Sequence, residues 1–234
     1  MIKVNFEEIG KLDYKSNEAY KTLRTNVAFC GKDIKVIVIT STTPGEGKTF
    51  VSFNLALSLA EAGKKVILLD ADLRKSVLAG RYHIDRAVRG FTHYLTGIYG
   101  KEEVIYQTNI ENLFIIFAGP IPPNPSELLG NKYSSDLISQ LREEYDYVII
   151  DAPPLGSVID GAIIASNCDG AILVIETNAN NRKLILGVKE QLEKTGCKIL
   201  GAVLNKATTT HENYYGKYMK KNDEKYFENA ISEV

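Results

Sequence analysis

The sequence predicts an α/β fold in which a mainly parallel β-sheet lies between two layers of helices. Short apolar segments rich in valine, isoleucine and leucine alternate along the chain with longer segments of helical periodicity. This alternation is typical of parallel strands joined by crossover helices. A glycine-rich turn follows one apolar segment, and aspartates follow two others. A chain of 234 residues is long enough to form one such domain with a substantial core.

The composition argues against several classes of protein. A formal net charge of −1 gives no strong field to attract nucleic acid or an anionic membrane. Cys30, Cys168 and Cys197 are far apart and form no paired-cysteine motif, so we expect a reduced, cytosolic protein. No apolar run approaches the roughly 20 residues that span a bilayer, and residues 1–15 lack the apolar centre of a signal peptide.

The N-terminal region is predicted to be an arm followed by a helix. Residues 1–15 are expected to be extended and residues 18–29 helical, with Ser16 or Asn17 as the N-cap. Three residues spaced four apart are expected to face the core: Ala19, Leu23 and Val27. Charged residues are expected on the opposite side: Glu18, Lys21 and Arg24. The pattern leaves open whether that side is a solvated surface or an interface.

The segment that determines the functional prediction begins with an apolar run at 36–39, which is too short for a helix and is predicted to be a buried strand. A turn over 41–47 follows, and helical periodicity begins at Phe50 and ends near Gly63. A strand, a glycine turn, Lys-Thr and a helix, in that order, are the context of a phosphate-binding loop. We therefore predict a three-layer P-loop NTPase fold.

Each part of this loop has a physical role in binding phosphate. Gly45 and Gly47 allow the backbone to direct N–H groups inward, and the helix N-terminus adds partial positive charge. Lys48 can reach the terminal phosphates, and the Thr49 hydroxyl can bind Mg²⁺. The usual motif has glycine where this chain has Thr42. The loop residues predicted to contact ATP are Thr43, Pro44, Gly45, Glu46, Gly47, Lys48, Thr49 and Phe50.

Two further strands are predicted to end in aspartates. An apolar run at 66–69 precedes Asp70 and Asp72, and another at 147–150 precedes Asp151. Ligands of α/β sheets bind at the carboxyl ends of strands, so these carboxylates are expected to lie beside the phosphate loop. One aspartate at such a strand end is enough to hold the Mg²⁺ shell. The surplus carboxylate indicates a base, or an extra Mg²⁺ contact, near the γ-phosphate.

The remaining segments complete the alternation. Further strands are predicted at 113–117, 171–175 and 199–204, and further helices at 102–107, 126–144 and 181–194. Prolines stiffen the loop at 119–125. Asp160 has no role that the sequence assigns. Asn205, at the end of the last strand, either hydrogen-bonds a purine edge or is an ordinary turn residue.

The C-terminal end of the chain differs in character from the rest. Residues 206–234 are polar, lose periodicity and cannot bury much surface, so we expect a flexible tail after a domain over 1–205. The arm and helix at 1–30 belong to that domain. The tail contains a cluster of tyrosines: Tyr214, Tyr215, Tyr218 and Tyr226. Composition alone leaves open whether these tyrosines are incidental.

Several motifs together resemble the bacterial tyrosine kinases of capsular and exopolysaccharide biosynthesis, in the form whose cytoplasmic kinase is a separate polypeptide. STTPGEGKT at 41–49 is similar to the first Walker box of that family, including the absence of the early glycine at Thr42. ILLDADLRK at 67–75 resembles its additional aspartate box, and VIIDAPP at 148–154 resembles its Walker B box. Shorter matches are PPNPSELL at 122–129 and LGAVLN at 200–205.

The resemblance implies ATP-dependent phosphorylation of tyrosine, chiefly in trans on a neighbour's tail, and a role in regulating polysaccharide synthesis and export. Such transfer requires positioning and charge neutralisation. We assign Lys48 to the β- and γ-phosphates, and assign Mg²⁺ to Thr49, Asp72 and Asp151. Asp70 is expected to accept or orient the tyrosine proton, although the division of roles between Asp70 and Asp72 is open. The tyrosine cluster matches the segment that these kinases autophosphorylate.

The resemblance also implies partners for this chain. The chain departs from the family's sequence pattern at two positions. The partners are neighbouring copies in a ring-type homo-oligomer, a cognate tyrosine phosphatase, and a transmembrane activator that holds the kinase at the inner face of the cell membrane. The family's interface motif is Glu-x-x-Arg-x-x-Arg, which here reads Glu18, Lys21 and Arg24. Lysine makes no planar bidentate contact, so ring assembly is expected to be weaker. Ser76 replaces a family proline and is expected to touch none of the proposed metal ligands.

Two other functions compete with this interpretation. A partitioning or division-site positioning ATPase of the same superfamily uses ATP as a dimer switch, but it usually carries a second lysine early in the loop, where this chain has Ser, Thr and Thr at 41–43. It also has no need of a tyrosine cluster. An iron–sulfur carrier requires a paired-cysteine motif, which the sequence lacks.

Overall fold

The computed structural model describes residues 2–6, 10, 12–82, 84, 89–177 and 182–207. The tyrosine cluster predicted as the phosphate acceptor lies outside these residues. The strands are β1 (Ile2–Val4), β2 (Val36–Ser41), β3 (Val66–Asp70), β4 (Tyr106–Thr108), β5 (Leu113–Ile116), β6 (Tyr147–Asp151), β7 (Gly170–Glu176) and β8 (Lys198–Asn205). They form one sheet in the order β1-β4-β5-β3-β6-β2-β7-β8. Neighbouring strands are parallel except β4 and β5, which confirms the mainly parallel sheet.

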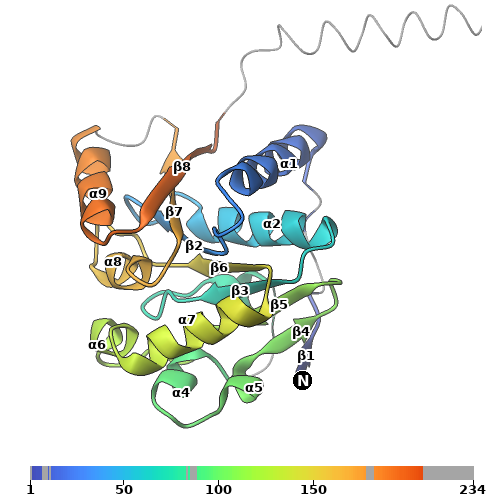
Figure 1. Ribbon diagram of the computed structural model, residues 1–234, viewed down its shortest axis with the longest axis vertical. Coiled ribbons are helices and arrows are strands. Elements are labelled where there is room, and N and C mark those ends of the chain that lie inside the picture. The colour runs from blue at the N-terminus through green and yellow to red at the C-terminus, as the bar shows by residue number, and fades with distance from the viewer. Residues whose placement is uncertain are drawn as a thin grey trace, which may run out of the picture.

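Helices cover both faces of this sheet (Figure 1). They are α1 (Tyr14–Phe29), α2 (Lys48–Glu61), α3 (Leu78–Arg81), α4 (Phe91–Leu95), α5 (Lys101–Val104), α6 (Pro125–Leu129), α7 (Lys132–Glu144), α8 (Asp160–Ala165) and α9 (Arg182–Lys194). Buried residues of α1, α2 and α3 belong to one apolar core, and those of α4 to α9 belong to the other. The three-layer fold is therefore confirmed. None of the described helices is long and apolar enough to cross a membrane.

The central strands are apolar because both of their faces are buried. Every residue of β2, β3 and the last four of β6 is buried. In β2, Val36 and Val38 join one core and Ile37 and Ile39 join the other, as the alternation of side chains along a strand requires. The parallel register places Asp70 directly beside Asp151. The two predicted aspartate-bearing strand ends are thus neighbours in the sheet.

The N-terminal region departs from the predicted arm and cap. β1 pairs with β4, so the arm contributes an edge strand. α1 begins at Tyr14, two residues before the predicted caps, because the Asp13 carboxylate accepts a 2.7 Å hydrogen bond from the Ser16 N–H. The buried residues of α1 are Tyr20 and Val27, whereas Ala19 is exposed. Leu23 is half-buried against the same core, so the inward direction is confirmed for Leu23 and Val27 and wrong for Ala19.

Two predicted helices were also wrong in extent. The helix expected over 102–107 ends at Val104, and residues 106–108 form β4. The single helix expected over 126–144 is two helices, α6 and α7, separated at Gly130 and Asn131. The Asn131 side chain accepts a 3.1 Å hydrogen bond from the Ser134 N–H, which caps α7 as a new helix.

Candidate active site

The phosphate loop connects β2 to α2 and contains two glycines in the left-handed conformation. The φ angle is 89° at Gly45 and 92° at Gly47, a region that residues with a Cβ rarely adopt. A Cβ at Gly47 would lie 2.1 Å from the Asn205 side-chain nitrogen, whereas a Cβ at Gly45 would meet nothing within 4 Å. The same nitrogen donates a 2.8 Å hydrogen bond to the Glu46 carbonyl. Asn205 therefore braces the loop; its proposed contact with a purine stays a prediction.

These two glycines provide a matched pair of substitutions. Gly45→Ala and Gly47→Ala both force alanine into a left-handed backbone, at a cost of about 1–2 kcal/mol each. Gly47→Ala should lower the free energy of unfolding by about 1 kcal/mol more than Gly45→Ala, because the hydrogen bond from Asn205 to the Glu46 carbonyl must break. Urea unfolding of both variants measures this difference. In an Asn205→Ala background the two substitutions should cost the same; a difference that persists there would contradict the explanation.

Glu46 is a buried part of the same loop. Its side chain accepts a 2.7 Å hydrogen bond from the Thr43 N–H and a 3.3 Å hydrogen bond from the Glu176 N–H in β7. The residue is 1% exposed. The side chain therefore holds the loop against the sheet, and we assign only the Glu46 backbone to the predicted nucleotide contacts.

The side chain of Lys48 lies among the predicted carboxylates. Its Nζ is 2.9 Å from Asp72 Oδ2 and 3.8 Å from Asp151 Oδ1, and it is 3.4 Å from the Thr49 hydroxyl. Burial lowers the pKa of Lys48, but the charges of Asp151 and Asp72 outweigh it and raise the pKa above its ordinary value. Lys48 is therefore a permanent cation at neutral pH, placed at the start of a helix.

Asp70 and Asp151 are almost completely buried, at 1% exposure each. Burial, and then the charge of Asp151, raises the pKa of Asp70 to about 7. Burial also raises the pKa of Asp151, against the opposing effects of Lys48, Thr49 and Ser52. A buried carboxyl group that titrates near neutral pH has the property required of a general base.

Ser76 reaches the proposed base. Its hydroxyl donates a 2.5 Å hydrogen bond to Asp70 Oδ2, while the Asp72 N–H donates to Asp70 Oδ1 at 3.2 Å. Ser76 was expected to touch none of the proposed metal ligands, and no local pattern predicts its contact with Asp70. The replacement of proline by serine thus adds a donor that orients the Asp70 carboxylate.

Asp160 has a partner that sequence reasoning missed. Arg74 Nε donates to Asp160 Oδ2 at 2.7 Å, and Arg74 Nη2 donates to Asp160 Oδ1 at 3.1 Å. The Ser126 hydroxyl donates to Asp160 Oδ1 at 2.7 Å. Asp160 is 0% exposed. This network links the loop after β3 to the first turns of α6 and α8, and no local pattern connects residues so far apart in sequence.

Asp160→Asn should destabilise the protein by about 1–3 kcal/mol at pH 7, because the bidentate contact with Arg74 is lost. Burial raises the pKa of Asp160, but the hydrogen bonds from Arg74 and Ser126 outweigh it and lower the pKa below its usual value. The stabilisation is therefore present above the unfolded pKa of about 3.9 and is lost as the pH falls through the folded pKa. The free energy of unfolding, measured in urea, should differ between wild type and variant at pH 7, and this difference should be smaller at pH 3. An equal difference at both values would contradict the ionic contribution.

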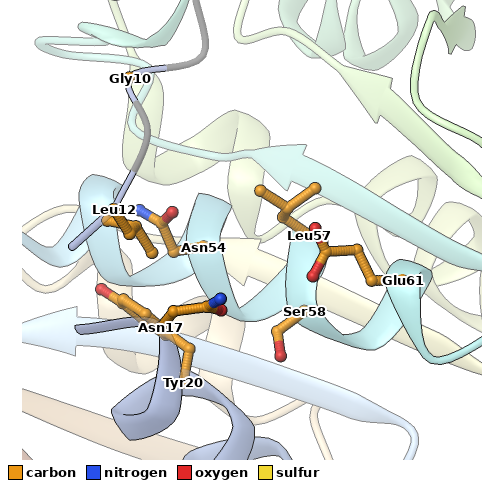
Figure 2. Close-up of a pocket in the computed structure, with 8 residues that line it drawn as sticks. All are labelled: Gly10, Leu12, Asn17, Tyr20, Asn54, Leu57, Ser58 and Glu61. Atoms are coloured by element: carbon orange, nitrogen blue, oxygen red, sulfur yellow. The ribbon is translucent and has the colours of Figure 1, made fainter. Parts of the chain in front are cut away.

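Three of the cavities on the described part of the chain are large enough to consider as ligand sites. One, of about 400 Å³, opens in front of the loop between Lys48, Asp72 and Pro154. Another, of about 500 Å³, lies between α1 and β8 and is lined by Phe50 and Asn205. The third, of about 330 Å³, lies between α1 and α2 (Figure 2). None of the residues proposed for catalysis or nucleotide binding lines the third cavity, so the first two are the candidate ligand sites.

Of the three residues predicted to form an interface, one makes a contact within the domain. Lys21 Nζ lies 2.7 Å from Glu18 Oε1 on the surface of α1. Arg24, in contrast, donates a 2.6 Å hydrogen bond to the Ser58 carbonyl on α2. Arg24 therefore points toward α2, and not away from the domain as expected. The role of Glu18, Lys21 and Arg24 in assembly stays a prediction.

The structure brings together Lys48, Thr49, Asp70, Asp72 and Asp151 at neighbouring strand ends. Among the described residues no group of three or more His, Cys, Asp and Glu side chains could hold a metal ion on its own. A hydroxyl with one or two carboxylates, completed by phosphate and water, is the donor set that Mg²⁺ uses in nucleotide sites. The fold and this cluster define the chain as a P-loop NTPase.

Comparisons with known proteins identify the family. A family profile described as AAA domain matches residues 34–195. The tyrosine-protein kinase CpsD of Streptococcus agalactiae is 43% identical over 209 residues, covering 88% of this chain and 91% of that protein. The tyrosine-protein kinase YwqD of Bacillus subtilis is 37% identical, covering 89% of this chain and 88% of its own. The chain belongs to the family of bacterial tyrosine kinases.

Solved structures agree with this membership. The crystal structure of the chimerical protein CapA2B2 superposes with a TM-score of 0.80 at 31% identity, covering 89% of this chain and 95% of that chain. The septum site-determining protein MinD of Pyrococcus horikoshii, complexed with Mg-ADP, has a TM-score of 0.65 at 28% identity, covering 77% and 73%. The CapA2B2 structure is thus the closer of these two, and the MinD structure reflects the shared fold.

Proposed function

We propose that this chain is an ATP-dependent protein-tyrosine autokinase that phosphorylates the C-terminal tyrosines of another copy and regulates capsular or exopolysaccharide synthesis. The observation that carries the proposal is the carboxylate cluster around Lys48, whose Asp70 has a pKa of about 7. A nucleotide switch needs carboxylates for its metal. A kinase also needs a group that accepts the proton of the incoming hydroxyl.

In this proposal the loop N–H groups over 43–49 and Lys48 hold the β- and γ-phosphates. Phe50 and Asn205 lie beside the adenine base, in the cavity between α1 and β8. Thr49, Asp72 and Asp151 would hold Mg²⁺, which neutralises phosphate charge when bound. Lys48, 2.9 Å from Asp72, has three N–H donors and can bind phosphate oxygens while this contact is kept. The Lys48–Asp72 pair thus keeps both side chains in place.

Asp70 receives the proton of the acceptor tyrosine. A free tyrosine hydroxyl has a pKa of about 10, so little of it is ionised at neutral pH. A carboxylate with a pKa near 7 is a matched acceptor, since it is about half ionised and still basic. The hydrogen bonds from Ser76 and the Asp72 N–H hold this carboxylate in one orientation.

The proposed partners follow from the need to bring a donor site to another chain's tail. They are copies of this chain in a ring, a transmembrane activator that places the kinase at the inner face of the membrane, and a cognate tyrosine phosphatase. The tyrosine-protein kinase CpsD of Streptococcus agalactiae, of which this chain covers 91%, is of similar length, which supports a separate activator. For Arg24 to enter a ring interface, its hydrogen bond to Ser58 must be exchanged.

The alternative is an ATP-driven dimer switch of the positioning type, and the similarity to MinD favours it to a limited degree. The two functions differ in where the γ-phosphate goes. A switch releases inorganic phosphate, whereas a kinase transfers it to a tyrosine.

The test is incubation of the full chain with ATP and Mg²⁺, with membranes of the source cell added in parallel, followed by mapping of phosphotyrosine by mass spectrometry. The expected sites are Tyr214, Tyr215, Tyr218 and Tyr226. Samples without ATP are the control. Hydrolysis of ATP with no modified tyrosine in either sample would support the switch.

A further inference from the structure

The cleft in front of the phosphate loop has positive charge that the nucleotide cluster does not use. Its lining includes Arg74, Lys75 and Arg81. Among the described residues, Asp72 is the one carboxylate residue in this lining. The volume of about 400 Å³ is enough for an aromatic side chain and its immediate neighbours.

The ion pairs of the cleft show which charges remain available. Lys48 is paired with Asp72 at 2.9 Å, and Arg74 is paired with Asp160 at 2.7 Å. Within the part of the chain that the structure describes, Lys75 and Arg81 form no ion pair, and both are exposed. The mouth of the cleft therefore carries two cations that no described carboxylate neutralises.

The position of Arg81 is fixed by the phosphate-loop helix. Its guanidinium carbon lies 5.8 Å from the centre of the Phe50 ring, one residue after Thr49. This cation–π contact holds the charge beside the loop. Lys75 comes three residues after Asp72, and its N–H donates a 3.0 Å hydrogen bond to the Asp72 carboxylate. The Arg81 guanidinium and the backbone of Lys75 are thus held next to the groups proposed for transfer.

The lining of the cleft also has an apolar part. Pro153 and Pro154 follow β6, and Val158 and Val77 complete this surface. Val77 is 41% exposed although it is aliphatic. Proline rings, the exposed Val77 and the half-buried Val158 suit one face of a tyrosine ring, whose hydroxyl can then reach polar groups. The cleft thus combines an apolar wall for the ring with cations for whatever flanks it.

We infer that this cleft selects acceptor tyrosines that are flanked by carboxylates, so that Tyr226 of a second copy is phosphorylated first and Tyr218 last. The inference rests on the proposed kinase function and adds the order in which its own tyrosines react. Complementary charge across a binding surface favours one partner and disfavours another of like charge.

The tail sequence provides this contrast within one chain. Asp223, Glu224 and Glu228 lie within three residues of Tyr226, together with one lysine. Three lysines and no carboxylate lie within three residues of Tyr218: Lys217, Lys220 and Lys221. Tyr214 and Tyr215 share one nearby carboxylate, at Glu212, and one nearby lysine, at Lys217. The cations of the cleft therefore attract the segment around Tyr226 and repel the segment around Tyr218.

Earlier phosphorylation then changes the weakest acceptor. Each phosphate on Tyr214 or Tyr215 adds about −1.5 to −2 charge close to Tyr218. That charge offsets the three lysines. Tyr218 should therefore react after its neighbours, and more slowly when both are replaced by phenylalanine.

The experiment separates enzyme from acceptor by using two full-length variants. The enzyme carries phenylalanine at the four tail tyrosines, and the acceptor carries Lys48→Met with its tail unchanged. Phosphorylation of each tyrosine is followed over time by mass spectrometry, with membranes of the source cell present. With the unchanged cleft, Tyr226 should be modified about 3- to 30-fold faster than Tyr218, as expected for a few partly exposed charge pairs.

Charge reversal in the enzyme tests the cause. Lys75→Glu together with Arg81→Glu should lower the phosphorylation rate of Tyr226 to that of Tyr218 or below it. The KM for ATP should change less than about 2-fold. An acceptor with Asp223→Lys and Glu224→Lys should recover a rate at Tyr226 with this reversed enzyme. Lys64→Glu, an exposed residue at the opposite end of β3, is the matched control and should leave the order unchanged.

If the phosphorylation rates at Tyr226 and Tyr218 are the same with the charge-reversed enzyme as with the unchanged enzyme, the inference is wrong. A loss explained entirely by a higher KM for ATP would also overturn it, because the two cations would then serve the nucleotide. Absence of phosphotyrosine with the unchanged cleft would instead overturn the proposed kinase function itself.

Discussion

Lys48→Met will abolish phosphorylation of the tail, with a loss of at least about 10³-fold in rate, while the chain remains folded. The ammonium group is the cation closest to the carboxylate cluster, 2.9 Å from Asp72. Electrostatic groups of this kind contribute about 10²- to 10³-fold each to transfer reactions, and Lys48 should also contribute to holding the phosphates in position. The rate is measured as phosphotyrosine formed per chain at saturating ATP.

The same variant should still act as an acceptor, because its tail is unchanged. It also removes the partner of two buried carboxylates, so its stability must be checked. Burial of Asp72 and Asp151 without a cation costs free energy, and some loss of stability in urea is expected. Full activity of a folded Lys48→Met protein would contradict the assignment of this residue.

Asp70→Asn should lower kcat by about 10²- to 10⁴-fold, the usual contribution of a positioned general base, and leave the KM for ATP nearly unchanged. Asparagine has almost the same shape; its amide oxygen can still accept from the Asp72 N–H, and its NH2 group can donate to the Ser76 hydroxyl oxygen, which now accepts. The kcat of the unchanged chain should rise as pH increases through about 7, because Asp70 must be ionised to accept a proton. The variant should lack this rise.

Asp72→Asn is the matched control for the division of roles. We place Asp72 in the Mg²⁺ shell, so its loss should raise the KM for Mg²⁺-ATP as well as lower kcat. If Asp72→Asn instead abolished the pH dependence and Asp70→Asn raised the KM, the roles of the two carboxylates would have to be exchanged.

The central sheet and the phosphate loop could be predicted because their signals are local. β2, β3 and β6 are buried on both faces, so each is a continuous run of β-branched and aliphatic residues. The loop has glycines at the left-handed positions, and Asp70 and Asp151 come directly at strand ends. Parallel strands place these ends at one edge, so the proximity of the acidic residues to Lys48 followed from topology.

The predictions of elements and contacts were wrong or incomplete where the local sequence pattern was weak, or where tertiary contacts determine the structure. β1 and β4 are three residues long, too short for alternation to be recognised. The break between α6 and α7 depends on Asn131 acting as a cap inside an otherwise helical pattern. Arg74, Ser126 and Asp160 meet only in the folded chain, 34 and 86 residues apart. Ser76 was identified as unusual, but its contact with Asp70 required the geometry of the turn after β3.

The account depends most on transfer of phosphate from the Lys48 site of one copy to a tyrosine of another. A tyrosine-free enzyme, with phenylalanine at 214, 215, 218 and 226, is mixed with an intact-tailed Lys48→Met chain, ATP, Mg²⁺ and source-cell membranes, and both chains are analysed for phosphotyrosine. We expect phosphotyrosine on the Lys48→Met chain, formed about 10²- to 10⁴-fold more slowly when the enzyme also carries Asp70→Asn. Release of inorganic phosphate with no phosphotyrosine on either chain would contradict the kinase assignment.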